Sequence, residues 1–442
     1  MKKTALFLAV LLLLTACSKD LPVSLTQARE LTSSELTALG HSEVCETYTG
    51  PYSTCYRNPD GSKTVYLYAA PLERLAFTQQ DSQTEVSSQS TSIRMRFPNQ
   101  VSSGFPIVLS SPTDQAELFF SRDTTGAFGE QTTPFGESRQ GIAYQNALSQ
   151  GISLTCFPTS FGVYTEFTLT HQPEQGILRF KLRAPGYRPD ASSPDYIRLQ
   201  KQSQQPDSDT GILLTAPLAV DANGRWIFPA SVKLVEKDAK TGTYTVEYSL
   251  SEDFLTQVSF PLTLSQSVYL GAPKQADTPL YEKTPQAAGH HLSPYLILGD
   301  QTEKGEGKTC VRFPALEYLN LDPEKILSAE YVIQNLLDAK SAATVSLYGI
   351  TENWCAINSR WETLPSCDPT PAGQVKVKKK GTYSIPCTDL MKDILKGFTD
   401  EQAAHNIRNG FLITCEEPGK SLLLASGDHG LYAPCLKLTV RS

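Results

Sequence analysis

The chain has 442 residues, with 39 Lys and Arg against 46 Asp and Glu, and a formal net charge of −7 at pH 7. This acidic balance argues against nucleic acid as a general partner, because binding a phosphate backbone requires a surplus of positive charge. The length allows two or three domains with cores of their own, and after the first sixteen residues no apolar run is long enough to span a membrane.

The first twenty residues have the pattern of a bacterial export signal. Lys2 and Lys3 precede an apolar run, Ala5–Leu14, that is short for a membrane span. The run ends in Leu-Thr-Ala followed by Cys17, which resembles the lipobox of bacterial lipoproteins. In that family the chain is cut before the cysteine, which is then acylated. The resemblance implies that residues 1–16 are removed and that Cys17 carries a lipid anchor.

This anchor predicts an exported protein held on the outer face of the cytoplasmic membrane or in the outer membrane, at the cell surface. Two or three acyl chains hold a protein stably where a single chain would be reversible. The alternative is an ordinary secretory signal in which the cysteine stands by chance.

The segment after the signal is polar. Residues 17–44 are predicted to be a tether, with one short helix over Ser33–Leu39. In residues 45–64, the Asn-Pro-Asp-Gly sequence at 58–61 predicts a turn between two short strands.

From residue 64 to about residue 264, apolar and polar side chains alternate with a period of two. In residues 178–183 Leu, Phe and Leu alternate with Arg, Lys and Arg, and residues 163–169 and 244–250 repeat the pattern. Such alternation is typical of half-buried strands. Many short strands separated by turns favour packed sheets over an α/β fold.

A second β-rich unit is predicted over residues 266–442, with one clear helix at Thr388–Lys396. Thr388 is a suitable N-cap, an apolar stripe occupies positions 390, 391, 394 and 395, and Gly397 is expected to end the helix. The predicted fold class is therefore all-β, with two β-sandwich, jelly-roll-like units at 45–265 and 266–442.

Nine cysteines follow Cys17, so at least one thiol is free or pairs with another molecule. Two pairs flank short, turn-rich loops and are the best candidates for disulfides, namely Cys45 with Cys55 and Cys355 with Cys367. Cys-x-x-Cys motifs and Cys/His clusters are absent from the sequence, so no zinc site, other metal site or cofactor is predicted.

Seven segments of residues 266–442 match, in order, the motifs of the DNRLRE domain, a β-sandwich module of bacterial and archaeal surface proteins. The matching segments are 295–299, 310–314, 326–330, Trp354 and Trp361 with Leu364-Pro365, 383–397, 409–412 and 434–438. The name-giving hexapeptide is absent, and Cys387 stands where family members carry Asp. The resemblance implies a carbohydrate-binding type of β-sandwich, since relatives accompany polysaccharide-degrading enzymes and some bind acidic glycans.

Residues 45–265 resemble, more loosely, the β-rich segment that precedes DNRLRE domains in wall-associated Rhs-type proteins. The resemblance rests on residues 144–154, 216–228 and 254–262. The closing Ile-Asp-Pro, the tyrosine–aspartate repeats and the toxin region of those proteins are not found in this sequence. Any activity is therefore expected to reside in the two β units.

No motif in the sequence points to catalysis. Gly-Lys-Thr at 307–309 lacks the upstream glycine of a phosphate-binding loop, and neither G-x-S-x-G nor H-E-x-x-H occurs. His290 and His291 are adjacent, so on a strand they would point to opposite faces. The histidines at positions 41, 171, 405 and 429 lie singly in polar contexts and are expected to be solvated. A glycosidase-type carboxylate pair stays open, because acidic residues are abundant.

Two kinds of residue are candidates for glycan binding. Trp354 and Trp361 could stack on sugar rings, although core packing is the alternative. Lys376, Lys378 and Lys380 belong to the densest basic run, and strand alternation would place them on one face. That face would either bind an anionic polysaccharide or protect an edge strand with solvated lysines.

These observations predict a non-enzymatic cell-envelope lipoprotein that displays a binding module for polysaccharide, with the membrane as a second partner through its lipid anchor. A structural or adhesive surface protein that contacts protein partners is the first alternative. A polysaccharide lyase or hydrolase with a site in the first β unit is the second.

Overall fold

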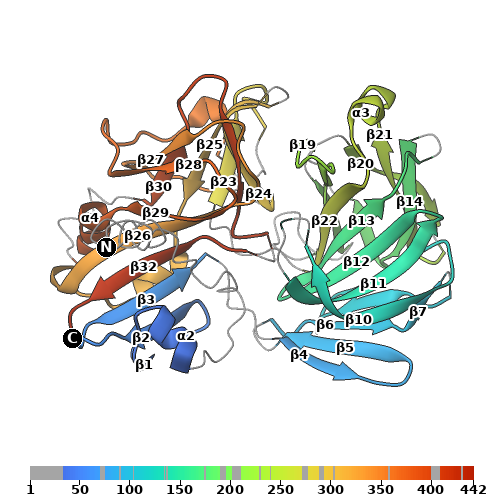
Figure 1. The fold of residues 1–442 in the computed structure, drawn as a ribbon, viewed down its shortest axis with the longest axis horizontal. Coiled ribbons are helices and arrows are strands. Elements are labelled where there is room, and N and C mark those ends of the chain that lie inside the picture. The colour runs from blue at the N-terminus through green and yellow to red at the C-terminus, as the bar shows by residue number, and fades with distance from the viewer. Residues whose placement is uncertain are drawn as a thin grey trace, which may run out of the picture.

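The computed structural model describes most of the chain from residue 33 onward (Figure 1). The described residues are 33–69, 75–88, 91–102, 104–133, 135, 138–173, 176–189, 196–201, 211–227, 230–238, 240–270, 277–287, 293–301, 304–356, 359–399, 409–429 and 432–442. The predictions for Cys17, for the pair His290 and His291, and for His405 fall outside these residues. No helix of the described part is long and apolar enough to cross a membrane.

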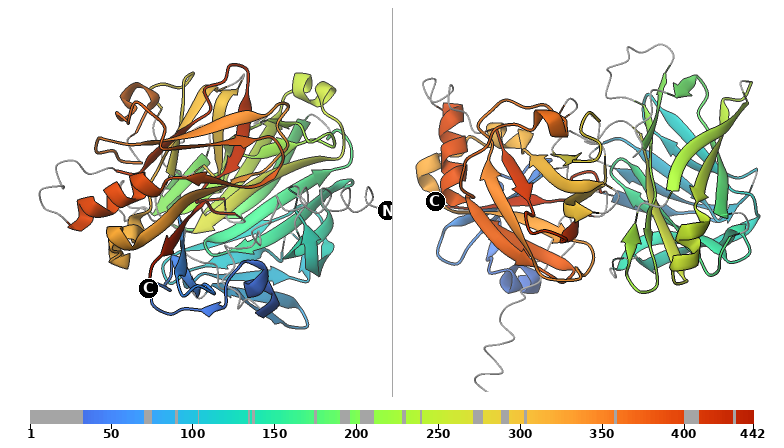
Figure 2. Two further views of the ribbon diagram at one scale, coloured as in Figure 1. Left: turned by 60° about the vertical axis from the view of Figure 1, so that its left-hand side comes forward. Right: turned by 90° about the horizontal axis from the view of Figure 1, so that it is seen from above.

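The described chain forms two β-rich units that lie side by side (Figures 1 and 2). Strands in all three sheets pair antiparallel, and the α-helices are short. The predicted all-β fold class is confirmed.

The first unit is a sandwich of two sheets. The eight-stranded sheet has the order β20-β21-β14-β9-β8-β6-β5-β4. Its strands are β4 (Leu75–Gln79), β5 (Gln83–Ser88), β6 (Arg94–Pro98), β8 (Ile107–Ser110), β9 (Gln115–Phe119), β14 (Ile177–Arg183), β20 (Ala230–Asp238) and β21 (Thr243–Leu250).

The eleven-stranded sheet has the order β15-β16-β17-β22-β13-β12-β11-β10-β7, with β18 paired to β22 and β19. Its strands are β7 (Gln100–Val101), β10 (Thr124–Thr132), β11 (Ser138–Ser149), β12 (Ile152–Thr159), β13 (Gly162–Leu169), β15 (Tyr187–Pro189), β16 (Tyr196–Lys201), β17 (Ile212–Thr215), β18 (Leu218–Val220), β19 (Trp226–Ile227) and β22 (Leu262–Leu270). The helix α3 (Glu252–Gln257), capped by the Ser251 hydroxyl, lies between β21 and β22 in the chain.

The core of the first unit forms between its two sheets because their strands alternate. Leu178, Phe180 and Leu182 of β14 belong to one buried cluster with Leu154 of β12 and Phe167 of β13. The polar residues between them on β14 point away from this core and are exposed or half-buried. The period of two in the sequence therefore corresponds to one buried and one outward side of each strand.

The second unit is built from one thirteen-stranded sheet that curls around its own core. Its path is β1-β2-β3-β32-β26-β31-β24-β25-β30-β27-β28, with β23 paired to β25 and β29 paired to β26. The strands are β1 (Glu43–Val44), β2 (Ser53–Arg57), β3 (Lys63–Tyr68), β23 (Asp277–Tyr281), β24 (Tyr295–Gln301), β25 (Gly305–Val311), β26 (Ile326–Asn335), β27 (Ala343–Gly349), β28 (Gly373–Val377), β29 (Gly381–Pro386), β30 (Phe411–Thr414), β31 (Ser421–Ala425) and β32 (Cys435–Val440).

The boundary between the units differs from the expected one at residue 45. Strand β3 pairs with β32 over its whole length, so residues 43–68 belong to the second unit. The helix α2 (Ser33–Ala38) confirms the expected short helix, and its Leu36 is buried with Tyr66 of β3. Part of the predicted tether is therefore folded onto the second unit. Alternation identifies a strand but not its partner, which is why the sequence placed this hairpin in the wrong unit.

Three short 3₁₀ helices, η3 (Pro314–Leu319), η4 (Pro323–Lys325) and η5 (Trp361–Thr363), and the helix α4 (Thr388–Thr399) complete the described second unit. The expected helix is confirmed, and its apolar residues Met391 and Ile394 are buried. Two details differ. The Thr388 hydroxyl accepts a hydrogen bond from the backbone amide of Ala329 in β26, which docks the helix on the sheet. The helix also continues past Gly397, which is buried and does not end it.

The two units meet in a separate buried cluster. Phe157 of β12 and Tyr164 of β13 point outward from the eleven-stranded sheet and pack with Tyr295 and Tyr432 of the second unit. The hydroxyl oxygens of Tyr164 and Tyr295 lie 3.3 Å apart. The second unit therefore covers the outer side of the eleven-stranded sheet at these strands.

Candidate functional site

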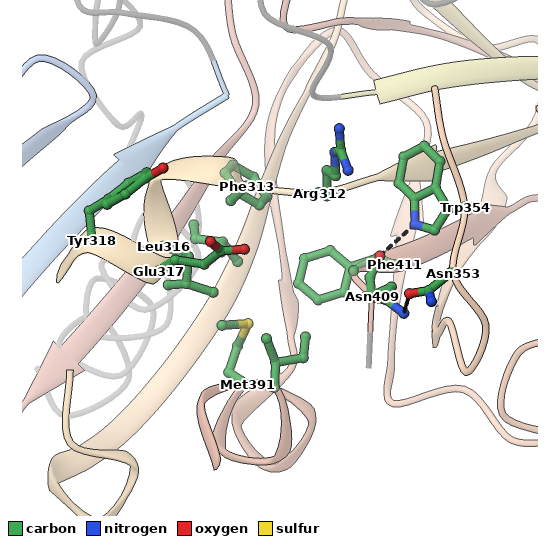
Figure 3. A pocket seen from close by; sticks show the side chains of 13 residues that line it. Arg312, Phe313, Leu316, Glu317, Tyr318, Asn353, Trp354, Met391, Asn409 and Phe411 are labelled. Atoms are coloured by element: carbon green, nitrogen blue, oxygen red, sulfur yellow. Dashed lines mark hydrogen bonds between the residues drawn. The ribbon is translucent and has the colours of Figure 1, made fainter. Parts of the chain in front are cut away.

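A solvent-open pocket of about 270 Å³ lies on the second unit, between η3, the loop after β27, the start of β30 and α4 (Figure 3). It is lined by Arg312, Phe313, Leu316, Glu317, Tyr318, Asn353, Trp354, Met391, Ile394, Asn409, Gly410, Phe411 and Leu436. We refer to it as the Trp354 pocket.

The indole of Trp354 is held firmly at one side of the pocket. Its Nε1–H donates to the backbone carbonyl of Asn409 at 2.5 Å, and the guanidinium carbon of Arg312 lies 5.6 Å from the centre of its ring. The Asn409 amide donates to the side-chain oxygen of Asn353 at 3.0 Å. These contacts fix the ring, so little side-chain freedom is lost when a ligand meets it.

The floor of the pocket is apolar and its far rim is aromatic. Figure 3 shows Tyr318 and Trp354 at opposite sides, with Phe313, Met391 and Phe411 between them. The floor residues are buried, whereas Tyr318 is 79% exposed. The pocket therefore offers aromatic surface together with amide and guanidinium groups, which is the combination that a sugar with apolar faces and polar edges requires.

The structure does not bring the two candidate tryptophans into one pocket. Trp361 of η5 packs beside Cys310 and Ile350 in a small cluster on the sheet, with Lys308 Nζ lying 5.1 Å from the centre of its ring. Trp354 is also partly buried against that cluster. Both rings are therefore partly buried against this cluster, and Trp354 also lines the pocket.

The expected face of three lysines is not formed. Lys376 lies in β28, but the strand ends at the buried Val377, so alternation does not extend to Lys378 and Lys380. The Nζ of Lys380 instead donates to the backbone carbonyl of Phe135 in the first unit at 2.8 Å. The sequence prediction assumed a longer strand, and the turn before β29 shortens it.

Lys379, which lies between Lys378 and Lys380, also has an ion-pair partner. Lys379 Nζ lies 2.7 Å from Asp338 Oδ2, and the backbone amide of Lys380 donates to Asp338 Oδ1 at 2.8 Å. These hydrogen bonds hold the pKa of Asp338 below its usual range. The basic run therefore serves mainly to close the turn and to contact the other unit.

The expected disulfides are not present, because all nine described cysteines are free thiols. Cys45 and Cys55 are buried neighbours whose backbones are joined by a 2.7 Å hydrogen bond, but the Cys45 thiol donates to Thr47. Cys367 packs in the cluster that contains Cys310, and Cys355 is exposed. The short loops hold their shape through backbone pairing, which the spacing of cysteines could not indicate.

Two of the histidines expected to be solvated are buried. His41 stacks on Tyr56 with ring centres 4.9 Å apart, and its Nδ1 lies 2.8 Å from Asn58 Oδ1. His429 is fully buried where the units meet, with its ring centre 5.5 Å from that of Tyr164. Sequence context alone did not reveal this, because a Ser-Gly-Asp-His-Gly segment is typical of an exposed loop.

Burial shifts the titration of several groups at this interface. It lowers the pKa of His429 to about 3, assisted by the positive charge of Arg139. It raises the pKa of Asp277 to about 7, although the Gly427 amide donates to Asp277 Oδ2 at 2.7 Å. Burial and the charge of Asp277 also raise the pKa of Asp428. Asp277, Asp428 and His429 are all buried. Separately, the described residues contain no group of three His, Cys, Asp or Glu side chains that could hold a metal ion.

Four lining residues of the pocket were not among the candidates that the sequence indicated, namely Arg312, Tyr318, Asn353 and Asn409. Arg312 and Asn409 stand in two segments that carry the DNRLRE resemblance, which is the one signal that could have singled them out. Tyr318 and Asn353 lie in connections between strands, where the sequence shows no periodic pattern.

Comparison with known proteins yields no relative that assigns a function. No family model and no curated protein matches the chain. Among solved structures, an N-terminal adhesin domain of Streptococcus gordonii is 8% identical over 88% of this chain and 92% of that one, with a TM-score of 0.14. A Paenibacillus xanthan lyase is 8% identical over 93% of this chain and 40% of that one, with a TM-score of 0.12. An exo-β-1,3-galactanase of Phanerochaete chrysosporium is 9% identical over 91% of this chain and 85% of that one, with a TM-score of 0.10. Scores this low carry no argument about fold or activity.

Proposed function

We propose that this chain is a cell-envelope lipoprotein whose second unit is a non-catalytic, polysaccharide-binding β-sandwich of the DNRLRE type, with the Trp354 pocket as its sugar site. The observation that carries the proposal is one open pocket in which a fixed indole and an exposed phenol flank amide and guanidinium groups. Sugar-binding sites need this pairing of aromatic faces with hydrogen-bonding edges.

The geometry assigns a part to each side of the pocket. The ring of Tyr318 is open for stacking on the C–H face of a pyranose, and the buried floor excludes water beneath it. Arg312 and Asn353 supply hydrogen-bonding groups for hydroxyl or carboxylate substituents. Glu317 is the one carboxyl group among the described lining residues, whereas glycoside hydrolysis uses two. The pocket therefore supports binding without turnover.

A glycan array with the mature chain, followed by retention on each polysaccharide that binds, tests the proposal. Tyr318→Ala and Trp354→Ala should each weaken retention at least tenfold, about 1.4 kcal/mol, because each removes one aromatic side of the pocket. Phe105→Ala is the matched control, since Phe105 is 64% exposed on the first unit and should leave retention unchanged.

The other functions would give different results. Release of reducing or unsaturated sugar ends during incubation would contradict binding without turnover and favour a hydrolase or lyase. Capture of a protein partner by a chain that binds no glycan would favour the structural or adhesive alternative. Tyr318→Ala is the safer variant to interpret, because an exposed ring can be removed with little effect on folding.

The lipid anchor is tested by membrane fractionation. Cys17→Ala should move the protein from the membrane fraction to the soluble fraction, because the acyl chains have no other attachment point. Cys355→Ala, which changes an exposed cysteine, is the matched control and should stay with the membrane. Membrane retention of the Cys17→Ala protein equal to that of wild type would contradict the anchor.

A further inference from the structure

A second surface lies on the first unit, where two grooves open on the outer side of the eight-stranded sheet. One groove has a volume of about 670 Å³ and lies over β9, β14 and β21, and the other, of about 410 Å³, lies over β4, β5, β6 and β8. The inner side of this sheet forms the core of the sandwich. The other sheet of the sandwich is the one that meets the second unit (Figure 1).

The strand register aligns polar side chains across this face. Seven residues follow one another in register from β21 to β4, namely Thr243, Arg183, Glu117, Val108, Arg96, Glu85 and Thr78, and all of them except the apolar Val108 are polar. Neighbouring strands are spaced by about 4.8 Å, so the row is roughly 29 Å long. A row of this length, perpendicular to the strands and connecting both grooves, suits an extended polymer better than a small molecule.

Cations outnumber exposed carboxylates along the two grooves, although the whole chain is acidic. The grooves are lined by Arg94, Arg96, Arg179, Lys181 and Arg183, against the exposed Glu85 and Asp238. The side chains of Arg179 and Arg183 are 56% and 43% exposed, whereas their partners Glu247 and Glu117 are only 10% and 8% exposed. The carboxylates thus lie beneath the guanidinium groups and hold them in place. Lys181 stands between the two arginines on β14 and is exposed.

The second groove is lined by Arg94 and Arg96 of β6, which are both exposed, and the exposed Glu85 of β5 stands opposite Arg96 in register. In the first groove, threonine hydroxyls at 241, 243 and 245 lie beside the cations. Phe119 adds an aromatic ring, over which the Arg183 guanidinium carbon lies at 5.7 Å. Fixed guanidinium groups bind carboxylates through paired hydrogen bonds, and hydroxyls and a ring suit sugar units.

We infer that the outer face of the eight-stranded sheet binds a linear acidic polysaccharide, with Arg179, Lys181 and Arg183 as the subsite for its carboxylate groups. This site is separate from the Trp354 pocket and does not depend on the function proposed for it. The acidic remainder of the chain would repel polyanions elsewhere, so binding would be confined to this face.

Retention of the full mature chain on polygalacturonate, a uronate polymer, tests the inference. The double variant Lys181→Glu/Arg96→Glu should weaken retention at least tenfold, because it reverses one exposed charge in each groove. The buried Glu247 and Glu117 keep their partners Arg179 and Arg183 in this variant, so Tm should change little. The contacts lie at the surface, within the Debye length of ~8–10 Å, so wild-type retention should fall steeply with added salt.

Matched variants separate the possible results. Lys376→Glu, which changes an exposed lysine on β28 of the second unit, should leave retention on polygalacturonate unchanged. Lys181→Arg should retain the polymer, since it keeps the charge. Equal retention of wild type and the double variant would overturn the inference, as would loss of retention only in Trp354→Ala. Equal binding to neutral dextran, or stronger binding to phosphatidylserine vesicles than to the polymer, would overturn it as well.

Discussion

The eleven-stranded sheet of the first unit turns its outer side chains toward the second unit, whereas the eight-stranded sheet turns its own toward solvent. Both sheets come from strands with the same period of two, so alternation does not distinguish them. Their outward residues do. Phe157 and Tyr164 on β12 and β13 are large and apolar enough to form an interface, whereas Arg179 and Lys181 on β14 are charged.

Two glutamates that point outward from the sheets show how the pKa of a carboxyl group differs between the covered face and the open face. Glu166 of β13 is fully enclosed, and burial raises its pKa well above the usual range. Glu247 of β21 accepts two hydrogen bonds from Arg179, which hold its pKa below its ordinary value. The covered face therefore favours a neutral carboxyl group, and the open face favours a charged one.

The comparison predicts that the covered face carries far more stability than the open one. Tyr164→Ala should lower the free energy of unfolding by roughly 3–5 kcal/mol, because it removes a fully buried ring from the interface. Lys181→Ala, on the open face, should change it by no more than about 0.5 kcal/mol. Urea unfolding of the two variants provides the measurement, and equal midpoints would break the comparison.

Asp277 gives the covered interface a characteristic pH dependence. Its pKa is about 7 in the folded protein against an ordinary value of 3.8. Between about pH 4 and pH 7 the folded state holds a proton that the unfolded state releases, so this group's contribution to stability falls as pH rises. Asp277→Asn removes that loss and should gain stability relative to wild type across the window, by roughly 2–4 kcal/mol.

Unfolding of both proteins at a series of pH values checks this prediction. His429, whose pKa of about 3 lies below the ordinary 6.5, contributes the opposite slope between those values. It is present in wild type and variant alike, so the difference between them reports Asp277 together with Asp428, whose pKa the Asp277 charge raises. A difference that is constant from pH 4 to pH 7 would contradict the raised pKa.

The smallest expected effects come from the two glutamates, and they differ in sign. Glu166→Gln should stabilise the protein relative to wild type as pH rises above about 4.5, by about 1–3 kcal/mol, because the variant has no carboxyl group that the fold must keep protonated while the unfolded chain releases its proton. Glu247→Gln should destabilise it by less than about 1 kcal/mol, since its partner Arg179 is largely exposed. That loss should vanish as pH falls through the lowered pKa of Glu247.

Thermal unfolding of both variants at pH 4 and pH 7.5 is sufficient to read these signs. Two variants that respond to pH in the same direction would show that Glu166 and Glu247 have similar surroundings, against the structure.

Local patterns predicted the strands well and the residues of the candidate pocket less well. The strands at 178–183 and 244–250 and the helix starting at Thr388 follow from the alternation, capping and stripe of adjacent residues. The pocket around Trp354 could not be predicted in this way, because it combines residues from five separate segments of the second unit. The predicted face of three lysines does not form, because β28 ends at Val377, one residue before Lys378.

By itself the sequence determined the all-β class and the buried and outward positions of strands such as 178–183, because side chains alternate wherever the backbone is extended. Only the tertiary structure decided that residues 43–68 pair with β32 and that Tyr164 and His429 are buried together while Lys181 is exposed. The backbone groups at a strand edge can pair with any strand in register, whatever its sequence. An outward side chain becomes buried only when a distant part of the chain folds over it. Both outcomes depend on contacts between distant residues, which a local pattern does not contain.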